Sequence, residues 1–173
     1  MLLPGETESL IEVIKYVSDP KVMLEIGCHL GKTSNAVLQA LPLLEKYYGV
    51  EIAYGYEPSL KSQQGETPKE PGKYAKHDPR FHLLLFKGGS RDLPLHLHEI
   101  GEVDVVFIDG DHSGEAIRFD TVLCRSMVRK GGIIIWHDYG NPDARVTEVL
   151  NSEMHAHHVI SHVPNTWLAY ECV

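Results

Sequence analysis

The stretch MLEIGCHLGKTS, residues 23–34, joins an apolar run, a glycine-rich turn and a helix start without a gap. The apolar residues at its beginning predict a buried strand. Gly27 and Gly31 allow a backbone that no Cβ atom obstructs, and Thr33 precedes apolar residues at helical spacing. A helix N-terminus carries unpaired N–H groups and the positive end of the helix dipole. This succession of strand, glycine turn and helix therefore predicts a binding site for a phosphate or a carboxylate.

Two kinds of ligand compete for this turn. The P-loop pattern Gly-x-x-x-x-Gly-Lys-Thr needs one residue more than the sequence places between Gly27 and Gly31. A buried Glu25 would also be an unusual neighbour for a polyphosphate. The stretch resembles, without a gap, the first motif of class I S-adenosylmethionine (SAM) methyltransferases: strand, acidic residue, Gly-x-x-x-Gly, then Ser or Thr. The cofactor contacts that this resemblance implies here are Glu25, Gly27, Cys28, His29, Gly31 and Thr33. A tight turn without a ligand is the third alternative.

Length and composition restrict the class of protein. A chain of 173 residues with 43% hydrophobic residues predicts a single domain over residues 1–173, which would bury about 70% of its unfolded surface. A net charge of −8 with no dense basic patch speaks against nucleic acid as a partner. Three cysteines without a Cys-x-x-Cys pair speak against a disulfide framework and a structural zinc site. No apolar run is long enough to span a membrane and no signal peptide is recognisable, so we expect a cytoplasmic protein.

Apolar runs and helical periodicity alternate along the chain. Strands are expected at residues 22–26, 50–56, 81–86, 103–108, 133–136, 159–163 and 167–173. Helices are expected at about residues 7–18, 33–44, 91–100, 113–130 and 142–150. The polar residues 59–80 follow neither period and are expected to form a loop or lid.

This alternation predicts an α/β fold, a doubly wound Rossmann-like sheet of mostly parallel strands with helices on both faces. The short link between the last two strands predicts an antiparallel pair at the C-terminus. The resemblance implies the same architecture, a seven-stranded class I methyltransferase sheet into which the last strand is inserted antiparallel.

Ligands of such sheets bind beyond the carboxyl ends of the strands, and polar residues follow several of the expected strands. Glu57 lies twenty-six residues after Gly31 at the expected end of the second strand, where a carboxylate can accept hydrogen bonds from ribose hydroxyls. Gly89 and Ser90 follow the third strand, where the family usually has a polar or acidic residue near the adenine. Together with Asp109 after the fourth strand, these residues complete the expected cofactor contacts.

The segments FIDGDHSGEAIRFD, residues 107–120, and GGIIIWHDY, residues 131–139, resemble small-molecule O-methyltransferases, including metal-dependent catechol-type and sugar-type enzymes. The resemblance implies that Asp109, His137 and Asp138 hold a divalent cation. Such a cation lowers the pKa of a hydroxyl group and fixes it in line with the sulfonium methyl. The aspartates favour Mg²⁺, whereas the histidine favours Mn²⁺, Fe²⁺ or Zn²⁺, or indicates no metal. Mg²⁺ or Mn²⁺ is the expectation.

His112 lies three residues after Asp109, where related enzymes carry a lysine or histidine as general base. Its ordinary pKa near 6.5 suits the removal of a hydroxyl proton. A helix-capping or solvated histidine is the alternative, and Asp111 would either orient His112 or act as a further ligand. The histidines at 96, 98, 155, 157, 158 and 162 are expected to be surface residues rather than a zinc site.

The predicted function is the transfer of a methyl group from SAM to a hydroxyl of a small molecule, assisted by a divalent cation and a histidine base. One alternative is a P-loop-like nucleotide-binding enzyme, because Asp109 after an apolar run also resembles a Walker B carboxylate. The other is a SAM-binding or interaction protein without turnover. A short N-terminus leaves little cover over the site, so the 59–80 segment or a second subunit of a homo-oligomer would supply it.

Overall fold

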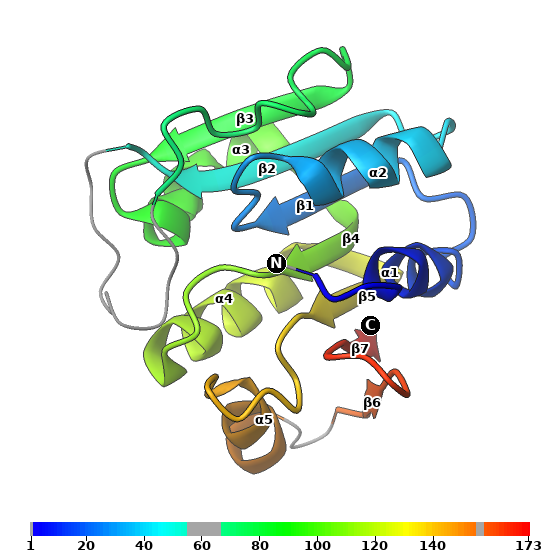
Figure 1. Ribbon diagram of the computed structural model, residues 1–173, viewed down its shortest axis with the longest axis vertical. Helices are drawn as coiled ribbons and strands as arrows, with labels where there is room; N and C mark the ends of the chain where they lie inside the picture. The colour runs from blue at the N-terminus through cyan, green and yellow to red at the C-terminus, as the bar shows by residue number, and fades with distance from the viewer. Residues whose placement is uncertain (1, 55–66, 155–157) are drawn as a thin grey trace.

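The computed structural model describes residues 2–54, 67–154 and 158–173. One sheet of seven strands forms its centre, in the order β3-β2-β1-β4-β5-β7-β6 (Figure 1). The strands are β1 Val22–Ile26, β2 Lys46–Ile52, β3 Phe81–Phe86, β4 Val103–Ile108, β5 Val128–Trp136, β6 Ile160–His162 and β7 Ala169–Cys172. The α-helices are α1 Glu6–Ile14, α2 Lys32–Ala40, α3 Leu97–Ile100, α4 Gly114–Met127 and α5 Val146–Val149.

Five of the strands, β1 to β5, pair in parallel, and β7 is antiparallel to both of its neighbours, β5 and β6. This arrangement confirms the predicted Rossmann-like sheet with an antiparallel pair at the C-terminus. The chain builds outward from β1 to β3 and then returns to the other side of β1 with β4. The carboxyl ends of β1 and β4 therefore border the crevice at which open α/β sheets bind ligands.

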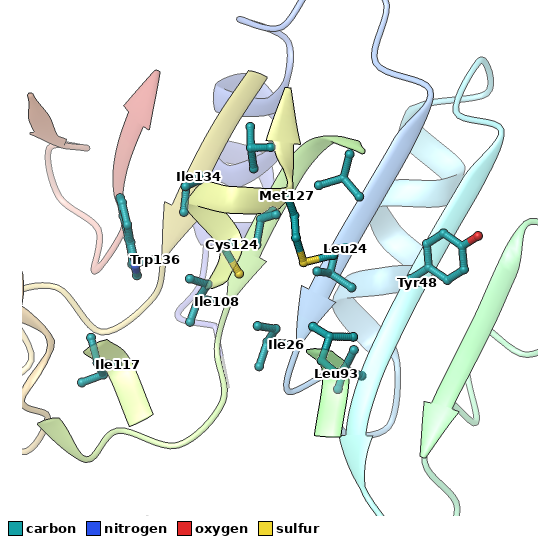
Figure 2. Packing of buried hydrophobic residues seen from close by; sticks show 14 of the residues in the cluster. Leu24, Ile26, Tyr48, Leu93, Ile108, Ile117, Cys124, Met127, Ile134 and Trp136 are labelled. Carbon is teal, nitrogen blue, oxygen red and sulfur yellow. The ribbon is translucent and has the colours of Figure 1, made fainter. Parts of the chain in front are cut away.

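Alternate residues of each central strand face opposite sides of the sheet, because side chains alternate along a strand. Leu24, Ile108 and Ile134 pack with α4 and α5 on one face, and Met23 and Phe107 pack with α1 and α2 on the other. Figure 2 shows part of the first cluster, with Cys124 and Met127 of α4 near the sheet residues. Such double coverage explains why β4 is apolar at nearly every position.

The second strand begins and ends earlier than the sequence predicts. It spans Lys46–Ile52 rather than residues 50–56, because Tyr47 and Tyr48 are buried and pair with β1. The predicted end of this strand, at residue 56, is therefore wrong by four residues. Glu57 itself lies outside the described residues.

The helices α1 and α2 end earlier than predicted, at Ile14 and Ala40, and two other segments differ in kind from the prediction. Residues 129–132 are not a helix stop but part of β5, where a Cβ atom on Gly132 would lie 2.6 Å from the backbone oxygen of Asp104. The expected helix at 91–100 is a 3₁₀ segment, Gly89–His96, followed by the four-residue α3. Pro94 within that segment has no N–H to donate and disfavours a continuous α-helix.

Residues 67–80, the described part of the expected lid, form turns that pack on α2 and its N-terminal turn. Arg80 donates hydrogen bonds to the carbonyls of Leu38, Leu41 and Leu44, at distances of 2.7–3.3 Å, and so caps the end of α2. In the part of the chain that the structure describes, no helix is long and apolar enough to cross a membrane.

Candidate active site

The turn after β1 is held against the ends of both neighbouring strands. The N–H groups of Gly27 and Cys28 donate to the carbonyl of Val50 in β2, at 2.9 and 3.1 Å. Gly27 has a φ of +87°, and a Cβ atom there would lie 2.2 Å from the backbone oxygen of Asp109. Only glycine fits this contact, which brings the turn directly against the end of β4.

The far side of the turn is covered by residues 72–75. Gly31 has a φ of +75°, and a Cβ atom on it would lie 3.0 Å from the Cα of Gly72. The N–H groups of Gly72 and Tyr74 donate to the carbonyls of His29 and Leu30, at 2.8 and 2.9 Å. This segment therefore forms a wall beside the turn, and its opening as a lid stays a prediction.

Glu25 is buried beneath the turn. Its Oε2 accepts hydrogen bonds from the hydroxyls of Ser34 and Tyr47, at 2.5 and 2.8 Å, which ties β1 to α2 and β2. Burial raises the pKa of Glu25 to about 8, although both hydrogen bonds act to lower it. The structure thus places Glu25 as a support of the turn, and its predicted contact with the cofactor stays a prediction.

Glu51 is a residue that the sequence interpretation missed. It lies one residue before the end of β2, and its Oε2 accepts a 2.6 Å hydrogen bond from the N–H of His29 in the glycine turn. Burial raises the pKa of Glu51. Glu51 thus lies where the sequence interpretation expects an acid at the end of the second strand, and the ribose contact of Glu57 stays a prediction. The distance of twenty residues between Gly31 and Glu51 matches the usual interval for a ribose-binding acid, which was a signal in the sequence.

The predicted metal ligands come together beyond β4 and β5. Nδ1 of His137 lies 3.1 Å from Oδ1 of Asp109 and 3.1 Å from Oδ2 of Asp138. Among the described residues, these three form the only group of His, Cys, Asp or Glu with three ligand atoms within 4.8 Å of one another. Burial opposes charge on His137, but hydrogen bonds to Asp109 and Asp138 outweigh it and raise the pKa of His137 to about 10.

His112 lies at the same cluster. Its Nε2 is 2.8 Å from Oδ2 of Asp138 and 3.9 Å from Oδ1 of Asp109, at angles that leave it without a directed hydrogen bond among the described residues. Burial opposes charge, yet the two carboxylates raise the pKa of His112 to about 9. The next residue, Ser113, caps α4 as predicted by accepting a hydrogen bond from the N–H of Ala116. With its pKa raised, the ring of His112 is protonated at neutral pH, and it could accept a proton from another group only after the charge of the two carboxylates is offset.

Glu6 is a further member of the cluster that the sequence interpretation missed. Its Oε2 lies 3.1 Å from Nε2 of His137, on the side of the ring opposite Asp109 and Asp138. An acid in the first turn of a helix is usually solvated, and no local pattern indicates that this one is buried. Burial acts to raise the pKa of Glu6, but hydrogen bonds from the N–H groups of Trp167 and Leu3 and from His137 lower it.

The donor set fits a divalent cation. Two aspartates and a histidine suit Mg²⁺ or Mn²⁺, and neighbouring ligands of an octahedral ion with bonds of about 2.1 Å lie about 3 Å apart. The two 3.1 Å separations around Nδ1 of His137 match that spacing. Three carboxylates and two imidazoles carry excess negative charge even when both rings are protonated.

Three predicted cofactor contacts, Gly89, Ser90 and Thr33, lie outside the glycine turn and the cluster of predicted metal ligands. Gly89 and Ser90 begin the 3₁₀ segment after β3, and Gly89 has a φ of +60° and open space around it. Thr33 lies half-buried in the first turn of α2. The structure also has a 290 Å³ cavity lined by residues that include Tyr139, His162 and Trp167, and Trp167 is a ring neighbour of His137. The binding roles of Gly89, Ser90 and Thr33 stay predictions.

A family model described as "Methyltransferase domain" matches residues 24–139, about two thirds of the chain. This chain belongs to the methyltransferase domain family. The match runs from β1 to just beyond Asp138, so it contains the glycine turn and the predicted metal ligands. The nucleotide-binding alternative is not favoured by this result. A search of curated proteins gave no match.

Solved structures of methyltransferases share the fold of this methyltransferase domain. The SAH-bound methyltransferase PaMTH1 of Podospora anserina has a TM-score of 0.69 and 18% identity, over 99% of this chain and 79% of that chain. The Bacillus cereus O-methyltransferase in complex with SAH has a TM-score of 0.65 and 14% identity, with 100% and 83% coverage. The MycE methyltransferase, in complex with Mg, SAH and mycinamycin VI, has a TM-score of 0.59 and 16% identity, with 97% and 49% coverage.

Proposed function

We propose that this methyltransferase domain transfers the methyl group of SAM to a hydroxyl group of a small molecule. The observation that carries the proposal is the contact between Gly27 and the backbone of Asp109, which joins the glycine turn to the Asp109–His137–Asp138 cluster. A cofactor on the turn would then lie next to the cluster. Similar folds bound to SAH, one of them also with Mg and mycinamycin VI, support this combination.

The cofactor would lie along the carboxyl edge from β1 to β3. The turn from Gly27 to Gly31 and the N-terminus of α2 suit the carboxylate of SAM, because helix N-termini attract anions. Glu51 is placed to bind the ribose hydroxyls, since it lies near the end of β2 and beside His29, and Glu57 is the alternative acid. Gly89 and Ser90 would border the adenine.

Asp109, His137 and Asp138 would hold a divalent cation, which supplies acidification and orientation of the acceptor hydroxyl. His112 would take the proton of that hydroxyl at Nε2 as the methyl group moves from the sulfur of SAM to the oxygen, which would leave S-adenosylhomocysteine and the methylated acceptor. His112 must be neutral to accept the proton. A cation on the two aspartates would offset the charge that raises its pKa.

Calorimetry with SAM, S-adenosylhomocysteine and ATP tests the cofactor. We expect saturable binding of the first two and weaker binding of ATP, and the reverse order would exclude the proposal.

Formation of S-adenosylhomocysteine across a panel of hydroxyl compounds, with and without chelator, then tests the reaction. We expect turnover that chelation abolishes while SAM stays bound. SAM binding without turnover on any member of the panel would favour a non-catalytic SAM-binding protein.

A further inference from the structure

We propose that Glu6 is a positioning residue that holds His137 in the tautomer and orientation needed to bind a divalent cation. The inference rests on the metal part of the proposed function. Glu6 is the first residue of α1, and the inference gives it a role in the site. Figure 1 shows the helix α1 in front of β5.

The two nitrogens of His137 face different partners. Nε2 lies 3.1 Å from Oε2 of Glu6, and Nδ1 lies 3.1 Å from an oxygen of each of Asp109 and Asp138. A carboxylate can only accept, so Glu6 favours the form of the ring in which Nε2 carries the hydrogen. The lone pair of Nδ1 is then free to join the oxygens of Asp109 and Asp138 around a cation. Ligand histidines commonly donate their other N–H to a carboxylate in this way.

Glu6 is itself held rigidly. Its Oε1 accepts a 2.5 Å hydrogen bond from the N–H of Trp167, and its Oε2 accepts one of 2.5 Å from the N–H of Leu3. Both the Glu6 and the His137 side chains are only 1% exposed. Two segments that are far apart in the sequence therefore fix the carboxylate, and the carboxylate fixes the imidazole ring.

A purely structural ion pair is the competing explanation. Such pairing would need equal numbers of carboxylates and imidazoliums, whereas three carboxylates surround the His137 ring and, among the described residues, His112 is the one other imidazole beside them. Burying charge that is not balanced is costly. A dication at Nδ1 would balance the two aspartates and leave Glu6 paired with the N–H of His137.

The test is Mn²⁺ affinity, measured by calorimetry on the full chain with Glu6→Gln. The amide keeps the size of Glu6 but loses its charge and one acceptor oxygen, and we expect Mn²⁺ to bind about 10–100-fold more weakly. Asp104→Asn is the matched control. Asp104 is also a buried carboxylate that accepts two backbone N–H groups, those of Lys21 and Val22, but it lies at the opposite end of β4. Both variants should lose thermal stability, and only Glu6→Gln should lose Mn²⁺ affinity.

A double-mutant cycle with His137→Asn separates positioning from general destabilisation. Once His137 is replaced, Glu6→Gln should have little further effect on Mn²⁺ affinity.

Nitrogen NMR of the Mg²⁺-loaded wild-type protein requires no variant to fold, and it should show a hydrogen on Nε2 of His137 and none on Nδ1. The opposite tautomer, or equal Mn²⁺ affinity in Glu6→Gln and wild type, would overturn the role of Glu6 alone. A wild-type protein that binds no Mn²⁺ or Mg²⁺ would overturn both this role and the proposed metal site, whereas SAM binding would still test the proposed cofactor.

Discussion

Glu25 and Asp138 are both buried carboxylates, yet their surroundings shift their pKa values in opposite directions. Among the described residues, the hydrogen-bond donors to Glu25 are two neutral hydroxyls, so burial dominates and raises its pKa to about 8. Burial acts in the same sense on Asp138, but His112 and His137 outweigh it and lower the pKa of Asp138 far below the usual range. Neutral hydroxyl neighbours thus leave Glu25 protonated, as suits an acid that supports the glycine turn. Cationic neighbours keep Asp138 charged, as ligand binding requires.

The raised pKa of Glu25 predicts a dependence of stability on pH. From pH 4.5 to about 8, the folded protein keeps a proton on Glu25 that the unfolded chain releases, so stability falls as pH rises. Glu25→Gln cannot ionise, and its stability should rise relative to wild type by up to about 1.4 kcal/mol per pH unit across this window. Urea unfolding at pH 5.5, 7 and 8.5 measures the difference. A constant difference between the two proteins would mean that Glu25 is already ionised in the fold.

His112→Gln tests the proposed base. Glutamine keeps the approximate size but cannot take a proton at neutral pH, so turnover should fall by about 10²–10⁴ while SAM affinity stays unchanged. The wild-type rate should rise with pH as His112 loses its proton, and the variant should lack this ionisation. Stopped assays from pH 6 to 10 follow both profiles. Equal rates and profiles would assign the proton to another acceptor.

Glu51 and Glu57 give opposing predictions for the ribose. Glu51→Gln should weaken SAM binding by about 1.5–3 kcal/mol, the usual contribution of a hydrogen bond to a charged group. Glu57→Gln serves as the comparison and should bind SAM as the wild type does. Calorimetry with both variants decides between the two acids, and a loss confined to Glu57→Gln would return the role to that residue.

The strand–turn–helix element depends on Gly27 in two ways, through its positive φ and through its contact with Asp109. Gly5 has nearly the same φ, +86° against +87°, but nothing lies within 4 Å of its Cβ position. Gly5→Ala should therefore cost about 1–2 kcal/mol of stability from backbone strain alone. Gly27→Ala should cost about 1–3 kcal/mol more from the clash, and should also weaken SAM binding. Chemical unfolding of both variants measures the difference, and equal losses would show that the turn can move away from β4.

Strands with clear apolar runs, such as β3 and β4, have the boundaries that the sequence predicts. The prediction fails where tertiary contacts override local signals. Tyr47 and Tyr48 follow the charged residues Glu45 and Lys46, but they become buried because β2 pairs along β1. The glycines at 131 and 132 resemble a helix stop, yet both lie in β5, and at Gly132 the backbone of β4 passes too close for a side chain.

At the scale of the whole molecule, the sequence predicts the convergence of Asp109, His112, His137 and Asp138. The carboxyl ends of parallel strands share one edge, so residues that follow β4 and β5 must meet there. The inclusion of Glu6 could not be predicted. It is separated from His137 by 131 residues and reaches the ring only because α1 packs across β5. The periodicity of apolar residues predicts where a helix such as α1 lies in the sequence. It does not predict which residues the ends of that helix contact, because those contacts depend on the assembled fold.

Because the cluster draws on β4, β5 and α1, a bound cation should stabilise the entire fold. At a free concentration of one hundred times its Kd, Mg²⁺ or Mn²⁺ should add about 2.7 kcal/mol. For a domain of this size, that corresponds to a rise in Tm of about 5–10 °C. Asp138→Asn should abolish the rise, because it removes one ligand, and Asp104→Asn should retain it, because Asp104 lies at the other end of β4. Differential scanning calorimetry with and without the cation measures the effect. An equal rise in all three proteins would show that the cation binds elsewhere and would remove the thermodynamic support for this site.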